Sequence, residues 1–258
     1  MSNTVKKTVI ITRAEQIQED IYSMCIQDEQ MADSAKPGQF VDLYCNDGSR
    51  ILPRPISICE IDKEKNTLRL VYRVVGKGTK EFSNLHAGAT ISVLGPLGNG
   101  FTMEGSKALL IGGGIGIPPM LELAKALCRE SIEVQVVLGY RDVLFLNQEF
   151  QAYGKVYIST EDGSYGTKGN VIDAIKEHNL TADVIYACGP TPMLKGVKAY
   201  GLEHGITTQL SLEEKMACGV GACLGCVCKT KDVNPLTQVN NKRICKDGPV
   251  FYAQEVEL

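Results

Sequence analysis

Four cysteines in the C-terminal part of the chain have the types and spacing of an iron–sulfur site. The first three are separated by four and then two residues, and the fourth follows after a loop: Cys218, Cys223, Cys226 and Cys245. Four thiolates at the spacing C-x₄-C-x₂-C…C can hold a [2Fe–2S] cluster. Gly219, Gly221 and Gly225 let the backbone turn tightly and point amide N–H groups at an anionic cluster. The sequence therefore predicts a [2Fe–2S] centre.

Two other interpretations of these cysteines compete with a cluster. A structural zinc site usually carries two C-x₂₋₄-C pairs, whereas three of these sulfurs share one glycine-rich loop. A zinc module without a redox role is nevertheless the alternative from a different class. A disulfide framework is disfavoured, because the sequence is long and scatters its other cysteines. Cys228 follows Cys226 by two residues, so spacing alone leaves the choice of ligands open.

Length and composition limit what the rest of the chain can be. The 258 residues suffice for two compact domains and a small appendage. A net charge of -3, without a basic run interleaved with aromatic residues, argues against a nucleic-acid surface. The longest apolar region, residues 108–127, is broken by glycines and prolines and does not predict a membrane-spanning helix.

Cysteine usage also bears on the cellular compartment. Ten cysteines without a secretory signal predict a reducing cytoplasm. Five cysteines outside the C-terminal stretch lie in apolar surroundings and are expected to be small core residues: Cys25, Cys45, Cys59, Cys128 and Cys188.

The first hundred residues alternate short β-rich runs with turn signals. The predicted strands cover residues 5–12, 21–26, 39–45, 56–61, 67–75 and 90–94. Several short strands at this spacing favour a small antiparallel barrel.

Two stretches of this predicted barrel could bind a phosphorylated ligand. Arg54 precedes a strand and could pair with a phosphate, and Ser57 on that strand could hydrogen-bond the edge of a ring. Farther on, a strand ends in Gly76 and Gly78, and Thr79 is expected to cap a short helix over residues 81–85. Each motif alone also fits a solvated arginine or an ordinary turn.

From residue 107 the pattern changes to alternating strands and helices. Strands are predicted over 108–111, 134–138, 155–159 and 184–187, and helical segments over 120–129, 147–152, 170–178 and 193–203. Repeated β–α–β units indicate a parallel, doubly wound sheet.

Two turns of this sheet could position a dinucleotide. The first strand leads into a glycine-rich loop that contains Gly112, Gly113, Gly114 and Gly116. The loop lacks the G-x-G-x-x-G fingerprint, and Pro118 is expected at the first position of the following helix. A later strand ends in Cys188, Gly189 and Pro190, where the carboxyl ends of strands border a ligand crevice or simply turn into a helix.

The order of these motifs resembles the ferredoxin-reductase superfamily, and the cysteine stretch narrows the resemblance to the electron-transfer subunits of class B dihydroorotate dehydrogenase. The strings that carry it are RPISI, YRVVGKGT, VLGPLGNGF, GGGIGIPPM, YACGP, MACGVGACLGCVCK and CKDGPVF. The resemblance implies a β-barrel plus α/β fold in three parts. These are an antiparallel FAD-binding barrel (1–101), an NAD-binding doubly wound α/β domain (102–210) and a [2Fe–2S] module (211–258).

The resemblance also implies which residues bind each cofactor. For FAD they are Arg54, Pro55, Ile56, Ser57, Val71, Tyr72, Arg73, Gly78 and Thr79. For NAD they are Gly112, Gly113, Gly114, Gly116, Cys188, Gly189 and Pro190. The cluster ligands implied are Cys218, Cys223, Cys226 and Cys245, because the family's fourth cysteine precedes the string DGPVF. Arg141 and Asp142 fit either NAD or NADP.

The implied activity is that of an oxidoreductase subunit in pyrimidine biosynthesis. Electrons would pass from the FMN of a catalytic partner, where dihydroorotate is oxidised, through the cluster and FAD to NAD⁺. No residue of this chain is expected to act on dihydroorotate. The family suggests a cytoplasmic heterotetramer with two copies of each subunit. The small subunit of an NADH-dependent ferredoxin:NADP oxidoreductase or of a sulfide dehydrogenase is the alternative within the superfamily.

Overall fold

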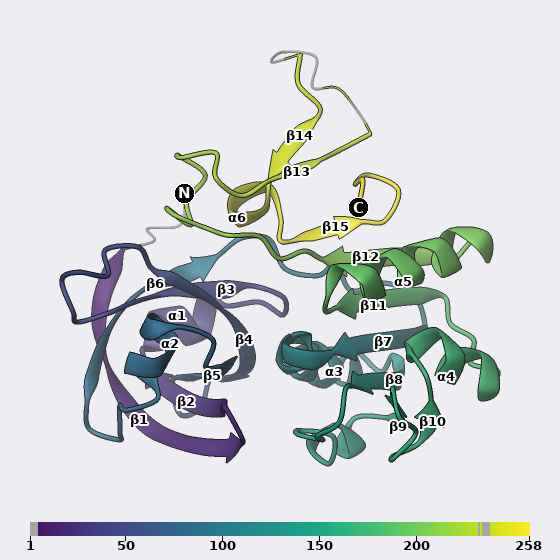
Figure 1. Ribbon diagram of the computed structural model, residues 1–258, viewed down its shortest axis with the longest axis horizontal. Coiled ribbons are helices and arrows are strands. Elements are labelled where there is room, and N and C mark those ends of the chain that lie inside the picture. Colours follow the sequence, from purple (N-terminus) through teal and green to yellow (C-terminus); the bar gives the residue numbers. More distant parts are fainter. Residues whose placement is uncertain (1–4, 232, 234–237) are drawn as a thin grey trace.

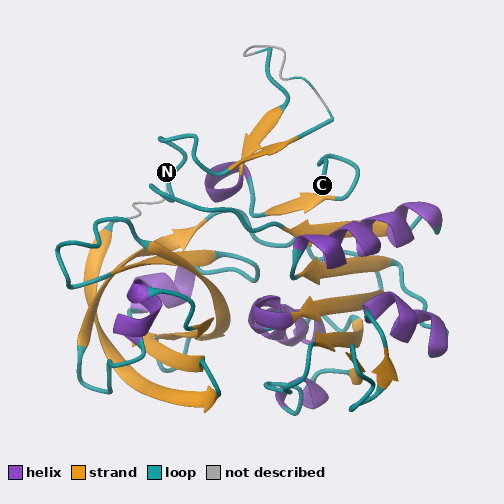
Figure 2. Cartoon of the chain, in the orientation of Figure 1, coloured by secondary structure: helices purple, strands orange, loops and turns teal. Residues whose placement is uncertain are grey.

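The structure is a computed structural model that describes residues 5–231, 233 and 238–258. Figure 1 shows a barrel on the left, an α/β domain on the right, and a C-terminal segment that lies over both. Figure 2 shows that the barrel is built almost entirely of strands, whereas strands and helices alternate in the α/β domain. No helix in the described part of the chain is long and apolar enough to cross a membrane.

The N-terminal domain is a closed antiparallel barrel. Its described strands follow the order β1–β2–β5–β4–β3–β6. Their bounds are Lys6–Gln18 (β1), Ile21–Gln27 (β2), Phe40–Tyr44 (β3), Arg54–Asp62 (β4), Thr67–Arg73 (β5) and Thr90–Leu97 (β6). Apolar side chains alternate along these strands and fill the interior, where Met24, Leu43 and Leu70 are fully buried. Two short helices, α1 (Glu29–Ser34) and α2 (Lys77–Phe82), interrupt the strand sequence.

The second domain is a sheet in the order β10–β9–β8–β7–β11–β12–β15. All described neighbours are parallel except β12 and β15. The strands are β7 (Lys107–Gly113), β8 (Glu133–Tyr140), β9 (Lys155–Thr160), β10 (Thr167–Lys168), β11 (Val184–Cys188), β12 (Thr207–Ser211) and β15 (Val250–Tyr252). Helix α3 (Pro118–Arg129) packs with one face of the sheet, and α4 (Val171–Glu177) and α5 (Thr191–Glu203) pack with the other. This arrangement confirms the predicted barrel and doubly wound sheet.

Several local predictions need correction. Helix α2 begins at Lys77 rather than near residue 81, so Gly76 is its N-cap and Thr79 is its third residue. The predicted helical segment over residues 147–152 contains the 3₁₀ turn η2 (Glu149–Ala152). Cys128 lies in the last turn of helix α3 and is exposed to solvent, so it is not the core residue that was predicted. Cys59 is buried as expected, and Pro118 is the first residue of α3.

The C-terminal segment shares its core with the α/β domain. It contains β13 (Val227–Lys229), β14 (Asn241–Arg243) and α6 (Ile244–Asp247) before β15. Strand β15 pairs with β12, and Phe251 faces Leu210 across this pair. Cys226, Cys245 and Phe251 belong to the same buried apolar cluster as Leu210. The cysteine-bearing segment is therefore packed onto the edge of the sheet.

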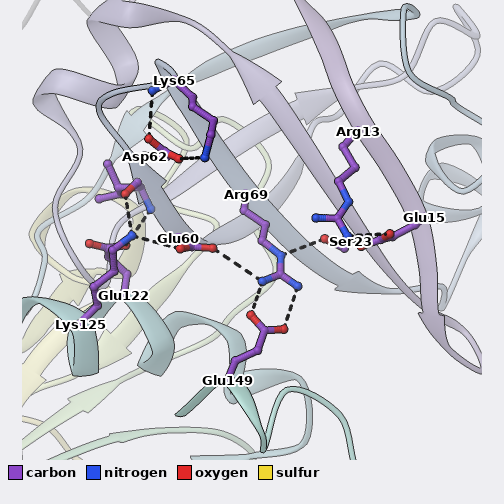
Figure 3. Close-up of polar contacts among 11 residues, drawn as sticks. Arg13, Glu15, Ser23, Glu60, Asp62, Lys65, Arg69, Glu122, Lys125 and Glu149 are labelled. Carbon is purple, nitrogen blue, oxygen red and sulfur yellow. Dashed lines mark hydrogen bonds and ion pairs between the residues drawn. The ribbon is translucent and has the colours of Figure 1, made fainter. Parts of the chain in front are cut away.

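Charged side chains join the barrel to the α/β domain in an ion-pair chain (Figure 3). Arg69 of β5 donates to both carboxylate oxygens of Glu149, at 2.5 and 3.1 Å. Lys125 of α3 donates to Glu60 of β4 at 3.0 Å. Glu122 of α3 is almost fully buried and accepts the backbone N–H of Ile61 at 2.7 Å. The contacts of Lys125 and Glu122 orient α3 against the barrel, and the Arg69–Glu149 pair attaches the 3₁₀ turn η2 to it.

Candidate functional site

A cavity of about 710 Å³ lies where the barrel, the α/β domain and the C-terminal segment meet. Its walls come from β4 and β5 of the barrel, from the turns after β7 and β11, and from the segment that follows β12. We call it the interdomain cavity. Its volume falls within the range of pockets that hold small-molecule ligands and cofactors.

Most of the predicted FAD residues line the barrel side of this cavity: Arg54, Pro55, Ile56, Ser57, Val71, Tyr72, Arg73 and Thr79. They come together because β4 and β5 are antiparallel neighbours. Gly78 is not a lining residue, but it lies under the Arg54 side chain. A Cβ at position 78 would lie 2.7 Å from Cζ of Arg54. The absence of a side chain at Gly78 therefore leaves room for the guanidinium at the rim of the cavity.

Thr79 shapes the backbone beside the cavity. Its hydroxyl accepts the N–H groups of Val75 and Gly76 at 3.0 and 3.2 Å and lies 3.1 Å from the carbonyl oxygen of Gly76. The residue is 7% exposed. The hydroxyl thus closes the turn into α2, a role that differs from the predicted cap of a later helix.

The α/β domain contributes fewer of its predicted residues to the cavity. Gly116, Cys188 and Gly189 line it, together with Ile115. The two turns touch, since a Cβ on Gly116 would lie 2.6 Å from the backbone nitrogen of Gly189. The other predicted NAD residues do not line the cavity: Gly112, Gly113, Gly114 and Pro190. Gly113 and Pro190 lie beside the Gly116–Gly189 contact, where a Cβ on Gly113 would be 3.3 Å from Cδ of Pro190.

One wall of the cavity was not predicted. Residues 211–216, which we call the connecting segment, run from the end of β12 along the cavity. They comprise Ser211, Leu212, Glu213, Glu214, Lys215 and Met216. The one sequence signal that could have identified this segment is its position, because Ala217 alone separates it from Cys218. Phe40, Leu52, Pro53, Val75 and Pro249 also line the cavity without having been predicted.

The four predicted cluster cysteines lie as two adjoining pairs. The Cys218 sulfur accepts the N–H groups of Ala222 and Cys223 at 3.3 and 3.4 Å and lies within hydrogen-bond reach of the Cys223 thiol. The Cys226 sulfur accepts the N–H of Cys245 at 3.4 Å, and both of these residues are 2% exposed. Within the described residues, no three metal-binding side chains converge on a point for a single metal ion. Two pairs of thiolates suit a cluster of two irons.

The local environment shifts the pKa values of Cys218 and Cys245 in opposite directions. Backbone N–H groups that point at its sulfur lower the pKa of Cys218 to about 6, against the opposing effect of burial. Burial, together with the neighbouring Cys226, raises the pKa of Cys245 to about 12. Cys218 is therefore ready to bind a metal as a thiolate, whereas Cys245 would release its proton on binding.

A buried carboxyl group lies beneath the cysteine loop (residues 218–226). Asp42 of β3 is 0% exposed, and neither carboxyl oxygen has a hydrogen-bond partner among the described residues. A Cβ on Gly219 would lie 2.9 Å from Cγ of Asp42, so the loop can approach this closely only with glycine there. Burial and the nearby Cys218 sulfur raise the pKa of Asp42 to about 7. In its protonated form Asp42 adds no negative charge beside the loop.

These features fit the three predicted groups. A large cavity with Arg54 at its rim suits a phosphorylated flavin. Gly116 and Gly189 line the cavity without side chains, so a second nucleotide could approach their backbone closely. Backbone N–H groups aimed at sulfur, with glycines at positive φ at Gly219 and Gly221, suit an anionic cluster.

Three stretches of the chain match known protein families. Residues 8–101 match an oxidoreductase FAD-binding domain. Residues 110–199 match an oxidoreductase NAD-binding domain. Residues 213–257 match the iron–sulfur cluster binding domain of dihydroorotate dehydrogenase B.

Individual relatives extend over nearly the whole chain. A dihydroorotate dehydrogenase B (NAD⁺) electron transfer subunit from Fusobacterium nucleatum is 46% identical over 255 residues and covers 94% of this chain and 95% of its own length. A second such subunit, from a Geobacillus species, is 43% identical over 260 residues and covers 98% of this chain and 99% of its own length. A chain in the structure of the NADH-dependent reduced ferredoxin-NADP oxidoreductase superposes with a TM-score of 0.87 at 31% identity, covering 100% of this chain and 91% of that one. By its similarity to these relatives over nearly its full length, the chain belongs to the family of dihydroorotate dehydrogenase B (NAD⁺) electron transfer subunits.

Proposed function

We propose that this chain is the electron-transfer subunit of an NAD-dependent dihydroorotate dehydrogenase in pyrimidine biosynthesis. Electrons would pass from the FMN of a catalytic partner through a [2Fe–2S] cluster and FAD of this chain to NAD⁺. The observation that carries the proposal is the interdomain cavity. Its walls combine the predicted flavin strands, the predicted dinucleotide turns and a segment that reaches a cluster cysteine after one further residue.

The proposal assigns residues to each group. FAD would be held by Arg54, Pro55, Ile56, Ser57, Val71, Tyr72, Arg73, Gly78 and Thr79. NAD would be held at Gly112, Gly113, Gly114, Gly116, Cys188, Gly189 and Pro190. The cluster would be held by Cys218, Cys223, Cys226 and Cys245. The corresponding domain limits are 1–101, 102–210 and 211–258, with β15 of the last part completing the sheet of the second.

The protein's contribution is to bind and orient these groups. When bound, FAD exchanges a hydride with nicotinamide and single electrons with an iron–sulfur centre. Arg54 would neutralise phosphate charge through charge-assisted hydrogen bonds. Ser57 lines the same wall and would donate to or accept from the flavin ring. The wall from Leu212 to Met216 would connect the cavity to the cysteine loop, with Leu212 as its buried residue.

The face around the cysteine loop is suited to a partner. Cys223 is exposed, and apolar side chains beside it are exposed as well: Val220 at 47%, Leu224 at 63% and Val227 at 39%. Apolar residues gathered on one surface mark interaction sites. We propose that the FMN-containing catalytic subunit docks on this face, in a cytoplasmic heterotetramer with two copies of each subunit.

A second candidate is the small subunit of an NADH-dependent ferredoxin:NADP oxidoreductase or of a sulfide dehydrogenase. The superposition over the whole chain with the reduced ferredoxin-NADP oxidoreductase favours the first of these two. Both candidates share the FAD, NAD and cluster assignments. They differ in the partner and in the substrate that the partner oxidises.

Isolation of the native complex tests the proposal. The chain is purified with its partner, the bound flavins, iron and sulfide are quantified, and NAD⁺ reduction by dihydroorotate is measured. We expect one FAD and one [2Fe–2S] cluster per chain, FMN on the partner and dihydroorotate-dependent formation of NADH. Cys223→Ser should remove iron and sulfide but leave FAD, while Cys128→Ser, at an exposed cysteine, should change neither.

Each result has a defined meaning. A different flavoprotein partner and no dihydroorotate activity would support the second candidate and contradict the first. Zinc in place of iron, without flavin, would contradict both. Full iron and sulfide in Cys223→Ser would show that the ligand set is wrong and would bring Cys228, on β13, into consideration.

A further inference from the structure

A turn of the FAD barrel is hydrogen-bonded to the helix that carries Cys245. The side-chain amide of Asn99 donates to the carbonyl oxygens of Lys246 and Asp247 at 3.2 and 3.1 Å. The backbone N–H of Asn99 donates to the carbonyl oxygen of Gly248 at 2.6 Å, and Asn99 forms a β-bridge with Pro249. Asn99 thus binds three consecutive carbonyl groups directly after Cys245.

The residue before Asn99 makes this approach possible. Gly98 has a φ of +72°, and a Cβ there would lie 2.6 Å from Cδ of Pro249 and 2.8 Å from the carbonyl oxygen of Gly248. On its other side the Gly98 carbonyl accepts the side-chain amide of Gln39 at 2.7 Å. The turn is therefore hydrogen-bonded to Gln39, the residue before β3, on one side and packed against Gly248 and Pro249, directly after α6, on the other.

A second set of bonds links α6 to the first cysteines. The Arg243 side chain donates to both carboxylate oxygens of Asp247 at 3.0 Å. The same guanidinium donates to the carbonyl oxygen of Gly221, in the cysteine loop, at 3.2 Å. Bonds from Asn99 therefore hold the three residues that follow Cys245, and they connect to the loop of Cys218 and Cys223 through Asp247 and Arg243.

We propose that Asn99 is a positioning residue for electron transfer, which holds the cluster cysteines at a fixed separation from the flavin site. The inference rests on the proposed function, because it presumes FAD in the interdomain cavity and a cluster on the four cysteines. Its structural basis is independent of that assignment. Pro249 lines the interdomain cavity and is bridged to Asn99, so one contact joins the cavity wall to the backbone after Cys245.

The physical reason is the steep dependence of electron transfer on distance. The rate falls exponentially with the gap between donor and acceptor, so a small displacement of α6 has a large kinetic effect. The cysteine segment is also attached through the β12–β15 pair and the covalent connecting segment, which do not lie on the barrel. Phe40 and Leu97 of the barrel share an apolar cluster with Cys226 and Cys245, and Gly219 lies against Asp42. Apolar packing is non-directional, whereas Asn99 adds directional hydrogen bonds from the barrel to α6.

The asparagine side chain is chemically suited to hold two neighbouring carbonyl groups. Two carbonyl oxygens need a donor, and the primary amide has two N–H groups. Asn99→Asp keeps the shape of the side chain but places carboxylate oxygens against those carbonyls. Asn99→Ala removes the donor without adding charge. Asn84→Ala is the matched control, since Asn84 is an exposed barrel residue in the turn after α2.

Rapid kinetics on the purified chain with its cofactors separates the two half-reactions. NADH is mixed with each variant, and flavin bleaching and cluster reduction are followed by absorbance, with the reduced cluster examined by electron paramagnetic resonance. We expect Asn99→Ala and Asn99→Asp to reduce FAD at the wild-type rate. Cluster reduction should slow by roughly tenfold or more, as sub-ångström to ångström displacements produce in preorganised sites. Asn84→Ala should match wild type in both steps.

Hydrogen exchange gives a readout that needs no electron transfer. Amides of residues 244–248 should exchange faster in Asn99→Ala and Asn99→Asp than in wild type and in Asn84→Ala, because their attachment to the barrel is lost. Loss of iron and sulfide from both Asn99 variants, with FAD retained and Asn84→Ala intact, would support the same role more strongly.

The outcomes separate failure of the inference from failure of the proposed function. Wild-type protein that binds no FAD or cluster, or that NADH does not reduce, contradicts the proposed function whatever the variants do. A competent wild type, with Asn99 variants that reduce the cluster at the wild-type rate and keep wild-type exchange in residues 244–248, overturns the role of Asn99.

Discussion

At the scale of single residues, the Arg54–Gly78 contact determines where the Arg54 guanidinium lies on the barrel side of the interdomain cavity. The guanidinium of Arg54 occupies the space that a side chain at position 78 would need. Gly78→Ala should displace Arg54 and weaken FAD binding at least about tenfold, because a hydrogen bond to a charged group contributes about 1.5–3 kcal/mol. Flavin content after gel filtration and the FAD dissociation constant of the apoprotein measure this effect.

A second glycine of the barrel serves as the control for this substitution. A Cβ at Gly48 would meet no atom within 4 Å. Gly48→Ala should therefore bind FAD as the wild type does. Equal FAD affinity in Gly78→Ala and Gly48→Ala would show that the position of Arg54 does not matter for flavin binding.

At the scale of elements, a buried carboxyl group on helix α3 binds strand β4, beside the Lys125–Glu60 ion pair. Glu122 accepts the Ile61 N–H at 2.7 Å, and a nonpolar residue in its place would leave that donor unpaired. Glu122→Ala should lower the free energy of unfolding by about 1–3 kcal/mol. Glu122→Gln keeps an acceptor and should avoid most of this loss. Thermal unfolding midpoints measure both, with Glu130→Gln at the exposed end of α3 as control.

The same carboxyl group gives the interface a pH dependence of known sign. Burial raises the pKa of Glu122 above its ordinary value of 4.5, despite the Ile61 N–H and the nearby Lys125 and Arg129. The folded protein therefore holds this proton more tightly than the unfolded chain does. The stability that Glu122 contributes through this proton falls as pH rises from 4.5 through the raised pKa of the folded state. Glu122→Gln has no such proton, so its midpoint should rise relative to wild type over that interval. A constant difference between the two across this interval would contradict the assignment.

At the scale of the whole molecule, the last strand unites the cysteine segment with the nucleotide domain. Phe251 of β15 is 3% exposed, faces Leu210 of β12 and shares a buried cluster with Cys226 and Cys245. One apolar core thus supports the sheet edge and the cluster cysteines and includes Phe40 and Leu97 of the barrel, while most of the barrel interior forms a core of its own.

Removal of the Phe251 ring tests this shared core. Phe251→Ala should lower stability by about 3–5 kcal/mol through the cavity that it leaves. It should also reduce iron and sulfide content while FAD stays bound, because Arg54 and Ser57 lie in the separate barrel. Tyr165→Ala, at a residue that is 54% exposed, should change stability by about 0.5 kcal/mol or less. Full cluster content in a destabilised Phe251→Ala would show that the two parts are independent.

Sequence patterns predicted the elements well where the signal was local. The barrel strands, the β–α–β repeats and Pro118 at the start of α3 follow from alternation, from helical periodicity and from the backbone limits of proline. The start of α2 was misplaced because Gly76 takes the N-cap position and Thr79 instead closes the turn before it. Strand β12 and the edge strand β15 were missed, because short runs of this kind acquire strand structure only by pairing.

By itself, the sequence determined the cysteine spacing, the order of the flavin and dinucleotide motifs and hence the family, since these are properties of residues close together in the chain. Only the tertiary structure decided that residues 211–216 form the third wall of the cavity and that Asn99 binds the backbone after Cys245. Asn99 is more than a hundred residues from its partners in the chain, as the separations of 147 and 148 show. No local pattern carries such a contact, because it depends on how β3, β6, β12 and β15 are packed together.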